Sequence, residues 1–308
     1  MKNFINISDL SENELRSIIE EAKKRKKNRK NLNKSSIDHD KPFDGKSMAM
    51  IFEKPSTRTR MSFEIAIKQL GGSCITLNPD VIHYGKGDET LKDTAKVLTE
   101  YVDIVMLRTS LHKNLEEFGK YLSIPIINGL SDLSHPCQIM SDILTFEEIK
   151  GKIKNQVISW LGDGNNNMSN SWIEAAGKFG FKLKIGCPDK YRPNKKILSW
   201  AKKNKVDLFI TKKPEEAVKD ADCVMTDKWV SMNDKVNKKL KKKNLEKYQV
   251  NKRLMQKAKA NAIFMHCLPV GRGEEVTNDV IDGSQSVVWK QALNRVHAQK
   301  SIINWCLG

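Results

Sequence analysis

The chain has 308 residues, of which 39% are apolar and 30% charged, and its formal net charge is +17. This length suits one large domain or two domains of about 150 residues. The charge is compatible with binding to nucleic acid or to a membrane surface. However, the two basic runs, 23–30 and 235–243, contain no interleaved aromatic residues and no nucleic-acid motif, which favours solvated surface.

Simple sequence features exclude several classes of protein. Acidic residues near the amino terminus, such as Asp9, Glu12 and Glu14, argue against a transit peptide. No apolar run approaches the ~20 residues that a membrane helix needs. The six cysteines are scattered without a CxxC pair, which indicates reduced thiols and argues against structural zinc. We therefore expect a cytoplasmic protein that binds neither nucleic acid nor membranes and holds no metal.

Strand-like and helix-like segments alternate in the first half of the chain. Ser11 to Glu14 form a capping box before apolar residues at helical spacing, so an amphipathic helix opens the chain. After a polar stretch, strands are predicted at 47–52, 73–77, 103–107 and 124–127. Helices are predicted at 59–70, 90–100, 114–121 and 137–150.

A second series of such segments begins after Gly151. Strands are predicted at 157–161, 181–185, 206–210, 223–226 and 262–265. Trp172 and Phe179 mark a helix after the first of these strands, and Pro214 suits the first residue of another helix. Such alternation is typical of mainly parallel sheets with helices on both faces. The predicted fold is α/β, with two such domains joined near Gly151.

Open parallel sheets bind ligands beyond the carboxyl ends of their strands. In the first predicted domain, the polar residues at these places are 56–60, Arg108 and 135–138. In the second, they are 162–167, 227–232 and 266–269. The first group is strongly cationic, whereas the second offers amides, one carboxylate and a thiol. The sequence thus predicts an anion site facing an amino-acid site across a cleft.

The segment Ser56-Thr-Arg-Thr-Arg60 has the chemistry of an anion site. It would form the first turn of the helix that ends near Leu70, where unpaired N–H groups and the helix dipole favour an anion. Its hydroxyls add donors, and the guanidinium groups of Arg58 and Arg60 suit phosphate. The chain has no GxxxxGK[ST] loop, which excludes a nucleotide P-loop. A solvated helix start with chance arginines is the open alternative.

Four motifs in this order resemble the aspartate/ornithine carbamoyltransferase family. Ser56-Thr-Arg-Thr-Arg60 resembles its carbamoyl-phosphate signature, and His135-Pro-Cys-Gln138 its second signature. Asp227-xxx-Ser231-Met232 and His266-Cys-Leu-Pro269 resemble the ornithine branch. The resemblance implies carbamoyl transfer from carbamoyl phosphate to the δ-amino group of L-ornithine, giving L-citrulline and phosphate in arginine metabolism. It implies no cofactor.

The resemblance also implies the residues that bind each substrate. Those for carbamoyl phosphate are Ser56, Thr57, Arg58, Thr59, His83, Arg108, His135, Gln138 and Arg295. Those for ornithine are Asn166, Asp227, Ser231, Met232, Cys267 and Leu268. Arg108, His135 and Cys267 would be catalytic. His83 stands near the position where many relatives carry glutamine, and a loop shifted by one residue is the alternative.

The chemistry of the second group fits an amine substrate. The single carboxylate of Asp227 suits an ammonium group, whereas an aspartate site would need cations there. The δ-amino group should have a pKa of about 10.4, so its deprotonation at pH 7 costs roughly 4.6 kcal/mol. Cys267 is the candidate proton acceptor or relay, or it only packs against ornithine. Putrescine or an acylated ornithine as the acceptor amine, and a nucleic-acid-binding protein that kept the fold, are the open alternatives.

Domain ranges and assembly follow from the same resemblance. The carbamoyl-phosphate-binding domain would span 1–150 and include a returning C-terminal helix at about 290–308, and the ornithine-binding domain would span 151–289. The loop around His83 would reach a neighbouring subunit's site in a homotrimer or a multiple of trimers. The polar segment 233–255 would include a mobile loop that closes on ornithine.

Overall fold

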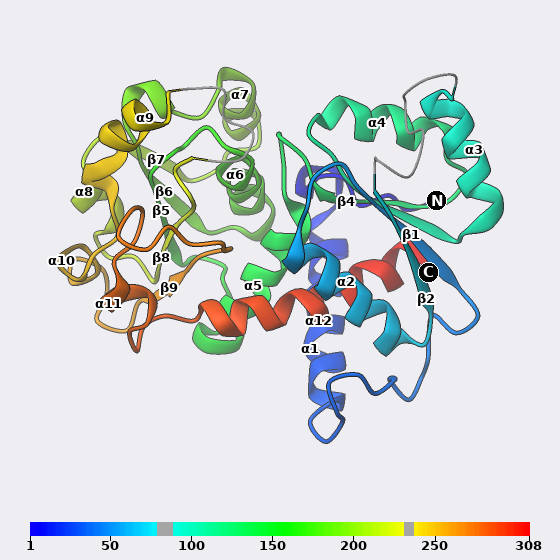
Figure 1. Ribbon diagram of the computed structural model, residues 1–308. Coiled ribbons are helices and arrows are strands. Elements are labelled where there is room, and N and C mark those ends of the chain that lie inside the picture. Colours follow the sequence, from blue (N-terminus) through cyan, green and yellow to red (C-terminus); the bar gives the residue numbers. More distant parts are fainter. Residues whose placement is uncertain (79–88, 231–236) are drawn as a thin grey trace. The chain divides into compact units, whose positions relative to one another are not determined.

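The computed structural model describes residues 1–78, 89–230 and 237–308. These residues form two compact units (Figure 1): the first unit is Met1–Leu144 with Leu293–Gly308, and the second is Thr145–Ala292. Three predicted site residues, His83, Ser231 and Met232, lie outside the described residues. None of the helices in the described ranges is long and apolar enough to cross a membrane.

The first unit is built on a four-stranded parallel sheet in the order β2-β1-β3-β4. The strands are β1 (Ser47–Phe52), β2 (Ser73–Leu77), β3 (Ile104–Arg108) and β4 (Ile126–Leu130). All residues of β1 after Ser47 are buried, so both faces of the sheet are covered.

Among the described residues, six α-helices contribute to the first unit. They are α1 (Glu12–Asn28), α2 (Thr57–Leu70), α3 (Leu91–Tyr101), α4 (His112–Tyr121), the start of α5 (Pro136–Lys150) and most of α12 (Val288–Leu307). Apolar residues of α3 and α4 pack on the sheet face that carries Ala49, Ile51, Val105 and Leu107. Because the chain reverses direction across the sheet after β2, right-handed connections put α2 on the other face. The last helix packs on this unit, as predicted.

The second unit contains a five-stranded parallel sheet in the order β7-β6-β5-β8-β9. Its strands are β5 (Val157–Leu161), β6 (Lys182–Gly186), β7 (Leu208–Thr211), β8 (Cys223–Thr226) and β9 (Ile263–Met265). Its helices are α6 (Asn167–Phe179), α7 (Lys195–Lys203), α8 (Pro214–Val218), α9 (Lys238–Leu245), α10 (Lys252–Met255) and α11 (Asn278–Ile281).

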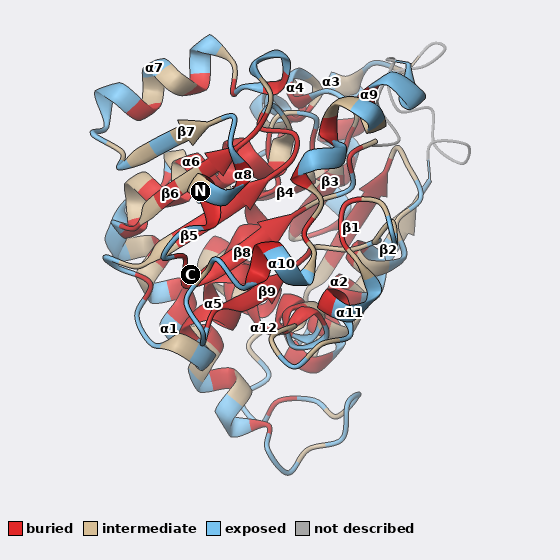
Figure 2. Cartoon of the chain, turned by 90° about the vertical axis from the view of Figure 1, so that its left-hand side faces the viewer, coloured by how far each residue is buried: buried red, intermediate tan, exposed pale blue. Residues whose placement is uncertain are grey.

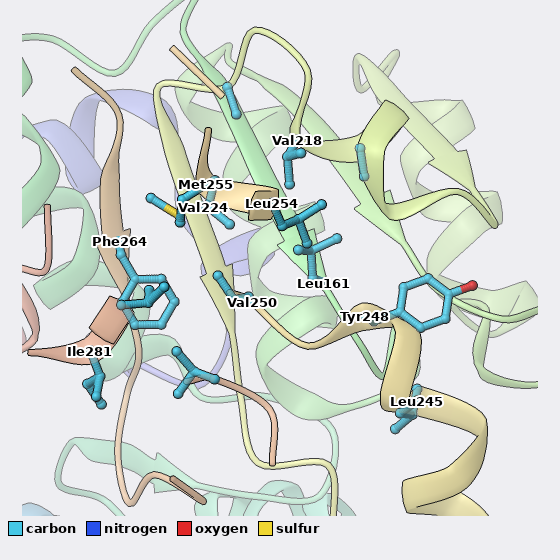
Figure 3. Close-up of a cluster of buried hydrophobic side chains, with 14 of the residues drawn as sticks. Leu161, Val218, Val224, Leu245, Tyr248, Val250, Leu254, Met255, Phe264 and Ile281 are labelled. Carbon is cyan, nitrogen blue, oxygen red and sulfur yellow. The ribbon is translucent and has the colours of Figure 1, made fainter. Parts of the chain in front are cut away.

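A hydrophobic cluster covers one face of the second sheet (Figure 3). Leu161, Val224 and Phe264, one from each of three neighbouring strands, are fully buried in it. Side chains of α8, α9, α10 and α11 pack against them, including Val218 and Ile281. Figure 2 shows most strands of both sheets in the colour of buried residues, whereas β2 and β7 are intermediate or exposed. This burial explains why strands such as 157–161 read as continuous apolar runs.

The predicted α/β class with two parallel-sheet domains is confirmed, and most element limits differ from the predictions by one or two residues. The strand predicted at 124–127 instead continues through Asn128, Gly129 and Leu130. Its pattern was hidden because the polar side chain of Asn128 is buried and donates to Ile5 O and Ser134 Oγ, both at 3.0 Å. The described part of the predicted mobile loop, 237–255, contains α9 and α10. Its closure and the domain limits stay predictions.

The interpretation of both basic runs as solvated surface is wrong for three residues. Arg25 is 7% exposed, Arg29 8% and Lys241 5%. Arg25 and Arg29 lie one helical turn apart, so both guanidinium groups point to the same side at the end of α1. The composition of a run does not show which of its members face a buried carboxylate.

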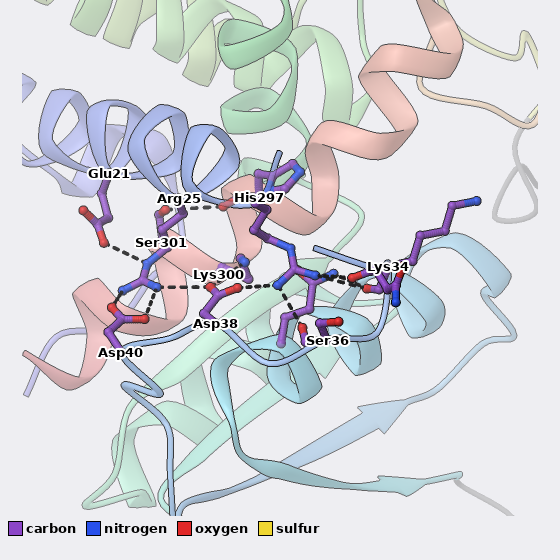
Figure 4. Close-up of polar contacts among 12 residues, drawn as sticks. Glu21, Arg25, Lys34, Ser36, Asp38, Asp40, His297, Lys300 and Ser301 are labelled. Carbon is purple, nitrogen blue, oxygen red and sulfur yellow. Dashed lines mark hydrogen bonds and ion pairs between the residues drawn. The ribbon is translucent and has the colours of Figure 1, made fainter. Parts of the chain in front are cut away.

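Asp38 is the centre of a buried charge network in the first unit (Figure 4). Its carboxylate accepts hydrogen bonds from Arg29 Nη1 at 2.5 Å, Lys300 Nζ at 2.7 Å and Arg25 Nη1 at 3.2 Å. Arg25 also binds Asp40 and Glu21. Burial lowers the pKa of Lys300 to about 8, so its ammonium group is mainly charged at pH 7. The network joins α1, the following loop and α12.

Replacing Asp38 with asparagine is expected to lower the free energy of unfolding by about 3 kcal/mol, because buried cations lose their shared carboxylate. Asp40→Asn is the matched control, since the Asp40 side chain is 59% exposed. It should cost less than about 1 kcal/mol. Urea denaturation at pH 7 measures both variants. Equal losses for the two would contradict a central role for Asp38.

Because His297 is buried, the folded protein is expected to lose stability in acid. Burial, followed by the nearby charge of Lys300, lowers its pKa from 6.5 to about 3. Between these values the unfolded chain binds a proton that the folded chain does not, so the free energy of unfolding falls as the pH falls below 6.5. From pH 7 to 4.5, wild type should lose about 2 kcal/mol more than His297→Gln. His39→Gln, at an exposed histidine, should follow wild type, and urea denaturation at both pH values tests this.

Candidate active site

In the first unit, the turn after β1 leads directly into α2. Ser56 is the N-cap of this helix, and its side chain accepts a hydrogen bond from the Thr59 N–H at 3.4 Å. Thr57 is exposed, Arg58 is half-buried and Thr59 is 1% exposed. The first turn thus presents backbone N–H groups and the positive end of a 14-residue helix, as an anion site requires.

Two guanidinium groups meet at Thr59. Its Oγ1 lies 3.0 Å from Nη1 of Arg108 and 3.0 Å from Nη2 of Arg295. Arg108 is the last residue of β3, and Arg295 comes from α12. Since guanidinium groups only donate, the hydroxyl oxygen accepts both bonds. Residues from three distant parts of the sequence therefore form one cationic group at the carboxyl end of the sheet.

Gln138 has its amide orientation fixed from both sides. Its Oε1 accepts a hydrogen bond from Nη1 of Arg295 at 2.7 Å, and its Nε2 donates to Oδ1 of Asp142 at 2.7 Å. Asp142 is 1% exposed and lies one turn further along α5. Asp142 is not among the predicted site residues, although its spacing of four residues from Gln138 was an available signal.

His135 is 4% exposed and directly precedes α5. Burial lowers its pKa well below the ordinary value, and the charges of Arg295, Arg108 and Arg58 lower it further. The imidazole is therefore neutral at pH 7, with one N–H donor and one acceptor nitrogen. The neighbouring Cys137 is buried, and burial raises the pKa of its thiol to about 12, so this cysteine is not a nucleophile.

The structure separates the two arginines of the Thr-Arg-Thr-Arg motif. Arg58 acts on the pKa of His135, whereas Arg60 binds Glu64 at 2.8 Å with 52% of its side chain exposed. A missed residue, Glu53, holds the end of β3 in place. Its N–H donates to Arg108 O at 2.9 Å, and its carboxylate accepts from Thr109 Oγ1 and Ser110 N, both at 2.7 Å. We call Arg58, Thr59, Arg108, His135, Gln138 and Arg295 the cationic site.

In the second unit, Asp227 and Cys267 follow the neighbouring strands β8 and β9 and lie side by side. The Cys267 thiol donates to Oδ1 of Asp227 at 3.2 Å, and the same oxygen accepts from the Lys228 N–H at 2.7 Å. Both side chains are half-buried, so a ligand has access to them. The structure therefore brings these two candidate residues, a carboxylate and a thiol, into contact.

Asn166 follows β5 in the same sheet and is the N-cap of α6. Its Oδ1 accepts from the Ser169 N–H at 2.8 Å, which fixes the side-chain amide with the oxygen toward the helix. The Nδ2 group is then directed away from that helix as a donor. Asn166, Asp227, Cys267 and Leu268 are called the carboxylate–thiol site.

Leu268 has an unusual backbone conformation for a leucine, with φ of +58°. A non-glycine residue in this left-handed region stores about 1–3 kcal/mol of strain. The conformation is held by a hydrogen bond from the Leu268 N–H to Nδ1 of the buried His266 at 2.9 Å. Nε2 of His266 lies 3.3 Å from Oε1 of Glu275, and both of these side chains are fully buried.

Asp227, His266 and Cys267 place possible metal-ligand atoms within 4.8 Å of one another. These residue types can bind zinc. However, His266 uses Nδ1 to accept the Leu268 N–H, and Nε2 faces Glu275. The cluster therefore fits hydrogen bonding better than metal binding, since a metal would have to displace one of these contacts.

Comparison with known proteins gives a match over nearly the whole chain. Residues 2–148 match the carbamoyl-P binding domain of aspartate/ornithine carbamoyltransferases, and residues 154–306 match the Asp/Orn binding domain. The chain belongs to the aspartate/ornithine carbamoyltransferase family. The resemblance inferred from the four motifs is thereby confirmed.

Relatives in this family align with the chain from end to end. It is 47% identical over 307 residues to an ornithine carbamoyltransferase of Nitrobacter winogradskyi, covering 100% of this chain and 97% of the relative. It is 49% identical over 308 residues to one from Rhodopseudomonas palustris, with 100% and 97% coverage. The structure of ornithine carbamoyltransferase from Pyrococcus furiosus matches with a TM-score of 0.91 at 42% identity, covering 98% of this chain and 96% of the other.

The two sites fall in different parts of this carbamoyltransferase. All residues of the carboxylate–thiol site lie in the range matched by the Asp/Orn binding domain. The cationic site lies in the range matched by the carbamoyl-P binding domain, with the exception of Arg295. Arg295 completes the cationic site from α12, whose later part belongs to the first unit.

Proposed function

We propose that this carbamoyltransferase transfers the carbamoyl group of carbamoyl phosphate to the δ-amino group of L-ornithine, giving L-citrulline and phosphate. The observation that carries the choice of ornithine is the carboxylate–thiol site. Asp227 supplies a carboxylate for an ammonium group, and Cys267 supplies a thiol in hydrogen-bond contact with it. The full-length relatives named ornithine carbamoyltransferase support the same choice.

The cationic site is proposed to bind carbamoyl phosphate. The first turn of α2, with Ser56, Thr57, Arg58 and Thr59, would hold the phosphate dianion together with Arg108. His135, Gln138 and Arg295 would lie near the carbamoyl group. Neutral His135 offers an N–H, and Arg108 and Arg295 offer charged donors, to the carbonyl oxygen. Donors aimed at this oxygen stabilise the negative charge that grows on it during attack.

The carboxylate–thiol site is proposed to bind ornithine. The Nδ2 group of Asn166, with the backbone of Met232, would donate to the α-carboxylate. Asp227 and Ser231 would hold the α-amino end, and Cys267 and Leu268 would lie near the δ-amino group. His83, outside the described residues, would donate to the carbamoyl group.

The reaction needs no covalent enzyme intermediate. The δ-ammonium group first loses a proton, with Cys267 as the proposed acceptor or relay and Asp227, its hydrogen-bond partner, orienting the substrate. The amine nitrogen then attacks the carbamoyl carbon, the bond from this carbon to the phosphate oxygen breaks, and phosphate leaves with the electron pair. The nitrogen gives up a second proton, which the departing phosphate can take.

Several coarser features are proposed with this function. The carbamoyl-phosphate domain would span 1–150 with about 290–308, and the ornithine domain 151–289; the two matched ranges support this division. The six cysteines are thiols in the structure, which supports a reducing, cytoplasmic location and a role in arginine metabolism there.

A homotrimer, or a multiple of trimers, is proposed as the assembly. Exposed apolar side chains of the first unit support a contact between subunits, since they include Tyr101 at 73% exposure, Ile75 at 54% and Met61 at 53%. Ile75 lies on β2, an edge strand of its sheet. Size-exclusion chromatography with light scattering would measure the molar mass of the assembly. The mass of a monomer would contradict this proposal.

Product formation by the purified protein tests the function. Carbamoyl phosphate is offered with ornithine, aspartate, putrescine or N-acetylornithine, and the ureido product is detected. Citrulline from ornithine alone is the expected result. Product from another amine would overturn the assignment of Asp227 while keeping the cationic site, and no product from any amine would refute the proposed reaction.

A further inference from the structure

One lysine of the basic run 235–243 is buried among exposed neighbours. Lys241 lies on α9 with its side chain 6% exposed, and its Nζ is 2.6 Å from Oδ2 of Asp163, whose side chain is 8% exposed. The same Nζ lies 5.6 Å from the ring centroid of Tyr191. Lys243, two residues later on α9, is exposed. Burying an ammonium group is costly unless it is paired, so this contact calls for a specific role.

Asp163 connects Lys241 to the turn that carries Asn166. It follows β5, and its Oδ1 accepts a hydrogen bond from the Asn165 N–H at 2.9 Å. Its backbone carbonyl accepts from Nε1 of the buried Trp160 at 3.0 Å. One carboxylate oxygen therefore holds the turn and the other binds Lys241, so the lysine sets the orientation of the group that shapes the turn.

The turn has little freedom on its other sides. A side chain at Gly164 would place its Cβ 2.8 Å from the backbone oxygen of Tyr191, so the two backbones are in close contact. The Gly164 carbonyl accepts from Ser169 Oγ at 2.8 Å, and Oδ1 of Asn165 accepts from Asn194 at 3.3 Å. Asn166 is then fixed as the N-cap of α6. Lys241 holds the same turn from α9.

We propose that Lys241 is a positioning residue for ornithine, acting through Asp163 to place the Asn166 amide that binds the α-carboxylate. This rests on the proposed function. The ion pair also joins two stretches of the chain that supply proposed ornithine-binding residues. In sequence, α9 follows the segment that contains Asp227, and Asp163 precedes Asn166. Loss of the Lys241–Asp163 ion pair would shift the Asn166 amide, although no group that touches the substrate would be removed.

Steady-state kinetics of Lys241→Met test the proposal, with Lys243→Met as a control of equal charge change on the same helix. We expect the KM for ornithine to rise about tenfold in Lys241→Met, because small misplacements of a binding group are costly. The KM for carbamoyl phosphate should stay within about twofold of wild type in both variants. Lys241→Arg keeps the ion pair and should keep the KM for ornithine within about threefold of wild type.

A purely structural role for the pair would give a different pattern. Lys241→Met would then lower the Tm but leave the KM for ornithine within about twofold of wild type, and the proposal would be wrong. Amide hydrogen exchange of the free protein is a second measurement that needs no turnover. Faster exchange at 165–169 in Lys241→Met, but not in Lys243→Met, is expected, and unchanged exchange contradicts the proposal. Wild-type protein that forms no citrulline would instead refute the proposed function.

Discussion

Replacing Arg295 with methionine is expected to lower kcat/KM for carbamoyl phosphate by about 10³-fold, because the loss of one charged donor at a developing oxyanion typically costs 10²–10³-fold. Arg295 also donates to Thr59 at 3.0 Å and to Gln138 at 2.7 Å, so its removal loosens two further residues of the cationic site. Methionine fills a similar volume, so most of the loss should lie in activity rather than in stability.

Arg60→Met is the control for Arg295→Met. Arg60 belongs to the same motif as Arg58, but it binds Glu64 on the exposed side of α2. Its loss should change kcat/KM by less than about threefold. Steady-state kinetics at varied carbamoyl phosphate, with Tm values for all proteins, measure both effects. If Arg295→Met changed kcat/KM as little as Arg60→Met is expected to, the cationic site would not depend on Arg295.

Asp227→Asn is expected to lower kcat/KM for ornithine by about 10³-fold, since truncating one partner of a charge pair costs about 2–5 kcal/mol. The substitution also removes the carboxylate that accepts a hydrogen bond from the Cys267 thiol, with Sγ 3.2 Å from Oδ1. Binding of carbamoyl phosphate alone, measured by calorimetry, should be unchanged because Asp227 and the cationic site belong to different units.

Asp207→Asn is the matched control for Asp227→Asn. Asp207 is an exposed aspartate of the second unit whose side chain lies 3.6 Å from Lys182 Nζ. This variant should keep kcat/KM for ornithine within about twofold of wild type. A wild-type value for Asp227→Asn as well would show that the carboxylate does not bind the substrate.

Much of the fold could be predicted because the strands are short apolar runs, and the segments between them show helical periodicity. The same pattern placed Arg108, Asp227 and Cys267 at strand ends, where parallel sheets bind ligands. The side-chain pairs could not be predicted in this way. Periodicity shows which face of an element is apolar, but not which distant charge a polar side chain will reach.

The missed residues show this limit. Glu53 is hydrogen-bonded to Arg108, and Asp142 is hydrogen-bonded to Gln138. Neither Glu53 nor Asp142 is part of an apolar pattern. Lys241 is one of several lysines in its run, and its burial and its contact with Asp163 distinguish it. Within the Thr-Arg-Thr-Arg motif, Arg60 pairs with Glu64 because the two are four residues apart on one helix.

Calorimetry with a joined analogue tests whether the cationic and carboxylate–thiol sites serve one reaction. The analogue carries a phosphonoacetyl group on the δ-nitrogen of L-ornithine. We predict that one molecule per chain binds more than about 10²-fold tighter than phosphonoacetate or ornithine alone, because the joined ligand resembles the reacting pair. Arg295→Met and Asp227→Asn should each remove most of this gain. Binding no tighter than that of the separate pieces would show that the two sites do not serve one reaction.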